Sequence, residues 1–149
     1  MFIRTLLASL FFLGFSAAAC AEGIVPTVSR DPQFDAAVAA IQVEHYDEAI
    51  KLLDAYVLRV PNDADAWNWL GFSSRKSGKL AQAFTYYEKA LAINPKHRGV
   101  HEYMGEAYLT ANNLAKAEEH LKFLSEDCIL PCQQYTKLKN AIAEYKAKR

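Results

Sequence analysis

A regular spacing of 34 residues organises most of this sequence and restricts the folds open to it. Three alanines lie 34 residues apart, at Ala49, Ala83 and Ala117. The same interval recurs in Tyr46, Leu80 and Leu114, in Pro61 with Pro95, and in Gly71 with Gly105. Small alanine allows two helices to cross closely, and proline ends a helix. A period of this length therefore indicates stacked helical units that bury their apolar faces against their neighbours.

The residues within each period resemble the tetratricopeptide repeat, whose pattern is W-x2-L-G-x2-Y, then A-x3-F, then P. The middle unit departs from this pattern only at Ser74, where Tyr is usual. Its matching residues are Trp67, Leu70, Gly71, Gly78, Ala83, Tyr87, Ala90 and Pro95. The third unit has His101 for the tryptophan and Met104 for the leucine, but it keeps Gly105, Tyr108, Leu114, Ala117 and Leu121. The first unit is degenerate, with Gln33 and Ala37 at the tryptophan and glycine positions, as terminal repeats commonly are.

The resemblance implies an all-α solenoid of three helix-turn-helix repeats, near residues 30–63, 64–97 and 98–128, within a domain at 31–128. We expect its helices near 32–43, 47–59, 64–77, 80–93, 98–111 and 114–126. Residues 129–149 should form a capping helix, because they carry an apolar stripe at helical spacing, namely Tyr135, Leu138, Ile142 and Tyr145. Such a helix covers the apolar face that the last repeat leaves exposed.

Local signals support these helix boundaries. Asp31 followed by Pro32 is typical of an N-cap and a first helical residue, and Asn62 or Asp63 can cap the third helix. Gly78 suits a left-handed helix end, and Asn112, at the same repeat position, tolerates that conformation.

Residues 1–21 have the layout of a secretory signal, with Arg4 followed by an apolar run at 6–15 and then by small residues. We expect cleavage after Ala21, a flexible leader at 22–30 and a periplasmic location. An alternative is a lipobox at 17–20, which would attach lipid to Cys20 and hold the protein at a membrane. Ala17 stands where such boxes usually carry Leu.

Cys128 and Cys132 are expected to form a structural disulfide, because they are an even pair in an oxidising compartment. Their C-x3-C spacing differs from the C-x2-C of thioredoxin-like motifs, and no βαβ pattern accompanies it. A thiol-redox function remains an alternative that this spacing disfavours.

Composition and motifs argue against several functional classes. The chain carries 17 Lys+Arg and 17 Asp+Glu, so it lacks the broad basic surface that nucleic-acid binding requires. It contains neither a G-x-S-x-G nucleophile motif nor a glycine-rich phosphate loop. His97 and His101 are one helical turn apart, but no third ligand stands at metal-motif spacing. We therefore expect no enzymatic activity, no metal and no cofactor.

The resemblance implies a non-catalytic protein-protein interaction module, a scaffold or chaperone-like factor of the bacterial envelope, with a lipid-anchored assembly factor as the alternative. Its partner, a peptide or helix, would bind in a concave groove lined by the first helix of each unit. The groove positions hold Phe34, Val38 and Ile41 in the first unit, Asp65, Asn68, Phe72 and Arg75 in the second, and Glu102, Glu106 and Leu109 in the third. We expect an apolar end at the first unit and an acidic end at Glu102 and Glu106, which suits hydrophobic anchors with a basic flank.

Overall fold

The computed structural model describes residues 31–130 and 132–149, so the predicted signal at 1–21 and leader at 22–30 lie outside the described residues. The described chain forms helices and no strand, which confirms the predicted all-α class. The helices agree with the predicted ranges to within one residue at each end for the three repeats. In chain order they are α1 (Pro32–Gln42), α2 (Tyr46–Arg59), α3 (Ala64–Lys76), α4 (Leu80–Ile93), α5 (Arg98–Thr110), α6 (Leu114–Asp127) and α7 (Gln133–Ala147).

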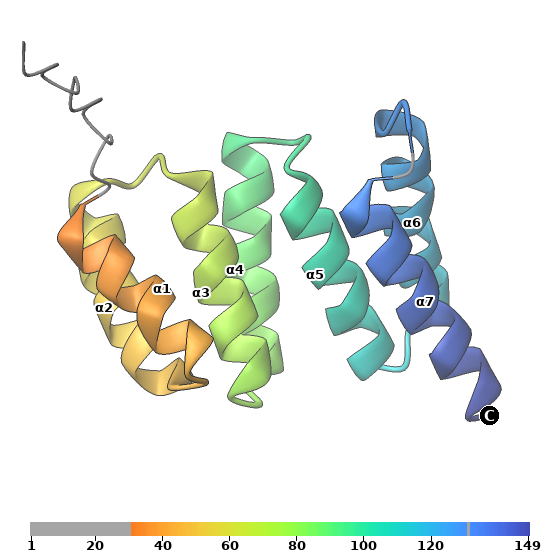
Figure 1. The fold of residues 1–149 in the computed structure, drawn as a ribbon, viewed down its shortest axis with the longest axis horizontal. Helices are drawn as coiled ribbons and strands as arrows, with labels where there is room; N and C mark the ends of the chain where they lie inside the picture. Colours follow the sequence, from red (N-terminus) through yellow and green to blue (C-terminus); the bar gives the residue numbers. More distant parts are fainter. Residues whose placement is uncertain (1–30, 131) are drawn as a thin grey trace, which may run out of the picture.

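The helices stack as antiparallel pairs in two layers (Figure 1). The pairs are α1 with α2, α3 with α4, and α5 with α6. In Figure 1 the nearer layer contains α1, α3, α5 and α7, and the layer behind it contains α2, α4 and α6. Helix α7 continues the nearer layer and packs against both α5 and α6, so the predicted solenoid with a capping helix is confirmed. Among the described residues, no helix is both long enough and apolar enough to span a bilayer.

Side-chain caps begin two of the first helices of the repeats as the sequence predicted. The carboxylate of Asp31 accepts a hydrogen bond from the Gln33 backbone N–H at 2.9 Å, and Pro32 opens α1. Of the two candidates for α3, Asp63 is the cap, because its carboxylate accepts a bond from the Ala66 N–H at 3.1 Å. Each carboxylate satisfies one of the N–H groups that a helix start leaves without an intrahelical acceptor.

The turn inside each helix pair places one repeat position in the left-handed conformation. Gly78 has a φ of 77° and Asn112 a φ of 59°, as their sequence positions predicted. Glu44 lies 34 residues before Gly78 and adopts a φ of 60°, although a glutamate side chain does not favour this region. The geometry of the helix pair therefore imposes the conformation on the first unit.

Small residues at the repeat positions set how closely the helices approach. Ala49, Ala83 and Ala117 are each 0% exposed. A β-carbon at Gly71 would overlap the ring of Tyr87, so α3 and α4 can meet this closely only because position 71 has no side chain. Tyr87 is fully buried, as its repeat position predicted. Leu138 and Ile142 of α7 are buried as well, so the predicted apolar stripe faces the repeats.

Two histidines meet between α5 and α6 in a contact that the sequence did not predict. The Nδ1 atoms of His101 and His120 lie 2.9 Å apart, and His101 Nε2 lies 3.0 Å from the carbonyl oxygen of Pro95. Because a carbonyl only accepts, His101 carries its proton on Nε2 and accepts a bond from the Nδ1–H of His120. Burial and the neighbouring His101 lower the pKa of His120 to about 4, and burial also lowers the pKa of His101. The hydrogen bond therefore requires a neutral His101, and burial disfavours the charged form of both rings.

We predict that acidification destabilises the third unit through this pair. The folded pKa of His120 lies below the ordinary value of 6.5, so the unfolded chain binds more protons and stability falls as pH drops below about 6.5. His120→Asn keeps a hydrogen-bond donor near the Nδ1 position but does not titrate. Between about pH 7.5 and pH 5, the wild type should lose about 1–2 kcal/mol more unfolding free energy than this variant.

Denaturant unfolding at a series of pH values measures the difference. His45→Asn serves as the control, because His45 lies exposed at the start of α2. Identical pH profiles for His120→Asn and the wild type would contradict the assignment.

Candidate functional site

Three aromatic side chains gather where α3 and α5 lie next to each other, and we call Trp69, Phe72 and Tyr103 the aromatic patch. Their ring centroids are 5.6 Å apart for Trp69 and Phe72, 4.8 Å for Phe72 and Tyr103, and 6.0 Å for Trp69 and Tyr103. Tyr46 extends the patch with an edge-to-face contact on Phe72 at 6.1 Å. All of these side chains are half-buried, so each offers part of its surface to a partner.

An ion pair joins the same two helices beside the patch. Arg75 donates to the carboxylate of Glu106 at 2.6 Å, and the guanidinium carbon of Arg75 lies 5.6 Å from the centre of the Phe72 ring. The Arg75 side chain is 13% exposed, so water screens this pair only partly. The pair holds the patch residues of α3 and α5 in register.

Four side-chain polar atoms of α3 are buried without a hydrogen-bond partner among the described residues. They are the oxygen of Asn68, the hydroxyls of Ser73 and Ser74, and the Nε of Arg75. Leaving such groups unpaired is unfavourable by about 1–3 kcal/mol each in proteins generally.

Of the predicted groove residues, Arg75 contacts both Phe72 and Glu106 at this surface. Val38 and Ile41 are half-buried on α1 against the first core cluster, and Asn68 is buried. Asp65 lies away from the patch at the start of α3, where its carboxylate is 2.9 Å from His97 Nε2. Trp69 and Tyr103 were missed as groove residues, although their 34-residue separation marks them as one repeat position.

Phe34 was predicted to line the groove, and this was wrong. Its side chain is 1% exposed and packs edge-to-face on Tyr56, with ring centroids 5.3 Å apart. The degenerate first unit has Gln33 at the tryptophan position, so its core takes the neighbouring aromatic residue instead. The apolar surface of this unit is therefore limited to Val38 and Ile41.

The predicted acidic end is also wrong, because α7 covers it. Glu102 is 2% exposed, and its carboxylate lies 3.5 Å from the ammonium of Lys137 on α7. Leu109 is buried in a cluster with Leu138 and Ile142 of α7. A β-carbon at Gly105 would overlap Leu138, so the glycine lets α7 settle directly onto α5. With Glu106 paired to Arg75, neither carboxylate is free to attract a basic partner.

Burial changes the titration of the groups under α7. It raises the pKa of Glu102 to about 7, against the opposing effect of Lys137, and it raises the pKa of Tyr103 to about 12 with help from Glu102 and Glu106. The carboxyl of Glu102 is therefore partly protonated near neutral pH.

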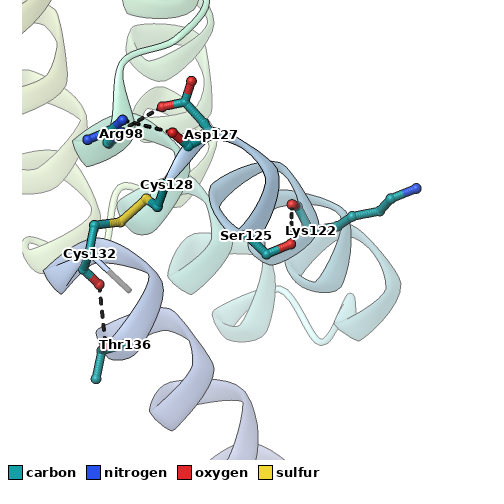
Figure 2. The surroundings of a disulfide bond; sticks show 7 residues. All are labelled: Arg98, Lys122, Ser125, Asp127, Cys128, Cys132 and Thr136. Atoms are coloured by element: carbon teal, nitrogen blue, oxygen red, sulfur yellow. Dashed lines mark hydrogen bonds and ion pairs between the residues drawn. A yellow bond between two sulfur atoms is a disulfide. The ribbon is translucent and has the colours of Figure 1, made fainter. Parts of the chain in front are cut away.

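The two cysteines connect the ends of α6 and α7 through the predicted disulfide (Figure 2). Their Cα atoms lie 5.9 Å apart, with Cys128 following α6 and Cys132 preceding α7. Beside them, Arg98 at the start of α5 donates to the Asp127 carboxylate at 2.7 Å and to the Asp127 backbone carbonyl at 2.9 Å. Three helix ends are thus joined at one point, which fixes the angle at which α7 meets α5.

The described residues contain no group of three or more His, Cys, Asp or Glu side chains arranged to hold a metal ion. His97 contacts Asp65 and His101 contacts His120, so the two histidines that the sequence placed one turn apart have separate partners. The aromatic patch can make apolar and cation–π contacts with a partner, and an ion pair lies beside it. These features suit binding.

We predict that Glu102→Gln stabilises the protein at and above neutral pH. A raised folded pKa means that the folded state binds more protons between about pH 4.5 and pH 7, so wild-type stability falls as pH rises through this window. The neutral amide avoids this loss and should gain about 2 kcal/mol above pH 7, with little difference near pH 4.5. Unfolding curves over this range test it, with the exposed Glu88→Gln on α4 as control. A variant less stable than the wild type at pH 8 would contradict burial as the dominant effect.

Replacing both Cys128 and Cys132 by Ser should lower the unfolding free energy by about 2 kcal/mol, because the closed loop is short. Hydrogen exchange should show the loss first in α7, whose attachment the disulfide fixes. Adding a reductant to the wild type provides the control, since it should reproduce the behaviour of the variant. An unchanged melting temperature in both cases would show that the disulfide does not hold α7.

Two tetratricopeptide repeat models match the chain, one over residues 34–98 and the other over residues 74–127. Together they span more than half of its 149 residues. A comparison with curated proteins gave no significant match.

Several solved bacterial structures share the fold. The Yersinia enterocolitica type III secretion translocator chaperone SycD superposes with a TM-score of 0.69 at 22% identity, covering 78% of this chain and 90% of SycD. SycD in complex with a peptide of the translocator YopD gives 0.67 at 21% identity, covering 78% and 91%. MamA from Desulfovibrio magneticus RS-1 gives 0.61 at 22% identity, covering 63% of this chain and 53% of MamA. With the repeat models spanning α1 to α6 and the helix arrangement shared with these structures, this chain belongs to the tetratricopeptide repeat family.

Proposed function

We propose that this protein is a non-catalytic binding module of the bacterial cell envelope that holds a peptide or helical segment of another protein on the layer of α1, α3 and α5. The observation that carries the proposal is the aromatic patch with the Arg75–Glu106 pair beside it. Tryptophan, tyrosine and arginine are the residues that most often dominate binding energy at protein interfaces. Here they occur together on α3 and α5, two neighbouring helices of one layer.

The proposed partner binds mainly through apolar anchors. Val38 and Ile41 are half-buried on α1, in the same layer as the patch, whereas α7 closes off the surface at the third unit. Because Glu102 and Glu106 already have cationic neighbours, a basic flank on the partner would gain little. The open surface is therefore shorter and less acidic than the sequence predicted.

The fold comparison supports a peptide as the ligand, since SycD has been solved with a peptide of the translocator YopD. The envelope location rests on the signal-like layout of residues 1–21.

Selection of random displayed peptides on the purified protein tests the binding proposal. We expect enriched peptides to share aliphatic or aromatic anchors, and Phe72→Ala should weaken them by roughly tenfold or more. Phe123→Ala on α6 is the matched control, because Phe123 is also half-buried but lies in the opposite layer. Thermal unfolding of both variants verifies that each remains folded. Equal loss of binding in both variants, or none in Phe72→Ala, would place the binding surface elsewhere.

A further inference from the structure

A second apolar surface lies on the opposite layer, between α2 and α4. It is a cavity of about 570 Å³ lined by Val57, Leu58, Trp67 and Tyr86 together with Lys51 and Lys89. Leu58 is 85% exposed, although it is a large aliphatic side chain. The volume is sufficient for two aliphatic side chains. We call this cavity the α2–α4 groove.

The charges in the groove favour a ligand with a carboxylate. The ammonium of Lys89 lies 4.3 Å from the centre of the Trp67 ring, and neither Lys89 nor Lys51 forms an ion pair with a carboxylate among the described residues. Asp54, the acidic residue of the lining, accepts a hydrogen bond from the Tyr86 hydroxyl at 3.1 Å. The groove therefore combines apolar walls with two lysines and one carboxylate, which leaves an excess of positive charge.

A loop of the same chain has the complementary chemistry. Ile129 and Leu130 are 100% and 78% exposed, and among the described residues they are the one adjacent pair of large apolar side chains exposed in this way. Glu126 precedes them on the last turn of α6, where its 66% exposed side chain lies 3.8 Å from the ammonium of Lys122, an exposed pair that water screens and that leaves the carboxylate accessible to a second cation. The disulfide that follows α6 constrains the loop (Figure 2), so its ordering on binding costs less than for a free segment.

We propose that the protein associates head to tail, with Ile129 and Leu130 of one copy entering the α2–α4 groove of the next and Glu126 facing Lys89 or Lys51. The groove lies in the first and second units and the loop at the far end of the third (Figure 1). The contact is therefore heterologous and leaves one free groove and one free loop on each pair, so assemblies grow with concentration. The sequence carries no net formal charge, so copies do not repel one another at long range.

Such an assembly leaves the aromatic patch open, because the patch lies on the other layer. Several patches in a row would bind a partner that carries repeated segments with an avidity above that of one copy. The contact itself is small, so we expect it to be transient and to require high micromolar protein or local crowding.

Sedimentation velocity of the oxidised protein without residues 1–21 tests the proposal. The weight-average mass should rise with concentration above that of one chain. Leu58→Glu removes the groove and Ile129→Asp with Leu130→Asp removes the loop, and each variant alone should remain a monomer. All three positions are exposed, so the variants should keep their fold, which circular dichroism verifies. An equimolar mixture of the two variants should form a dimer and nothing larger, since one supplies the loop and the other the groove.

The charge contact has its own test. Lys89→Glu should weaken association by roughly threefold to tenfold, and Glu126→Lys in the same chain should restore it if Lys89 is the facing cation. A wild type that is monomeric at every concentration would overturn the proposal and leave the groove to another partner. Association that persists in both single-surface variants would overturn it as well, because the interface would then lie elsewhere.

Discussion

The close approach of paired helices at small residues is the constraint on which the rest of this structure depends. The absence of a side chain at Gly71 leaves room for the ring of Tyr87. The small buried alanines at the 34-residue interval allow a similarly close approach in each helix pair. Close packing of this kind fixes the distance between the paired helices, because so dense a core leaves no room for an added methyl group. The two layers follow from it, and so does the open face of α1, α3 and α5 on which the aromatic patch lies.

The equivalent glycine of the third unit makes room for a different helix. Gly105 admits Leu138 of α7 rather than a side chain of its own pair, so the capping helix rests directly on α5. As a consequence, the carboxyl of Glu102 is buried beside Lys137, and its pKa is raised to about 7. One glycine position thus lets a helix pair form in the second unit and lets α7 cover the proposed binding face in the third. A terminal cap that occupies part of that face limits the length of segment that can bind.

Sequence reasoning predicted the helices and the stacking because these depend on local periodicity. The turn positions at Gly78 and Asn112 carry their own conformational signal, and Asp31 and Asp63 carry a capping signal. The residue type of Glu44 carries no such signal, because the helix pair imposes its left-handed backbone conformation. Repeat register assigned Phe72, Arg75 and Glu106 to one face, and in the structure Arg75 contacts the other two. Repeat register wrongly predicted that Phe34 and Glu102 are exposed in the groove. Phe34 is buried because the degenerate first unit uses it in its core, and Glu102 is buried because α7 covers it.

The two tryptophans of the chain allow the central claim to be tested in one spectrum. The indole N–H of Trp67 donates to the carbonyl of Pro61 at 2.7 Å and lies beside the α2–α4 groove, whereas Trp69 belongs to the aromatic patch. A selected peptide can be titrated into ¹⁵N-labelled protein at a low, fixed concentration while both indole resonances are followed. If partners bind the face of α1, α3 and α5, the Trp69 indole signal shifts with saturation and the Trp67 signal stays in place. A shift of Trp67 with an unmoved Trp69 would contradict the account.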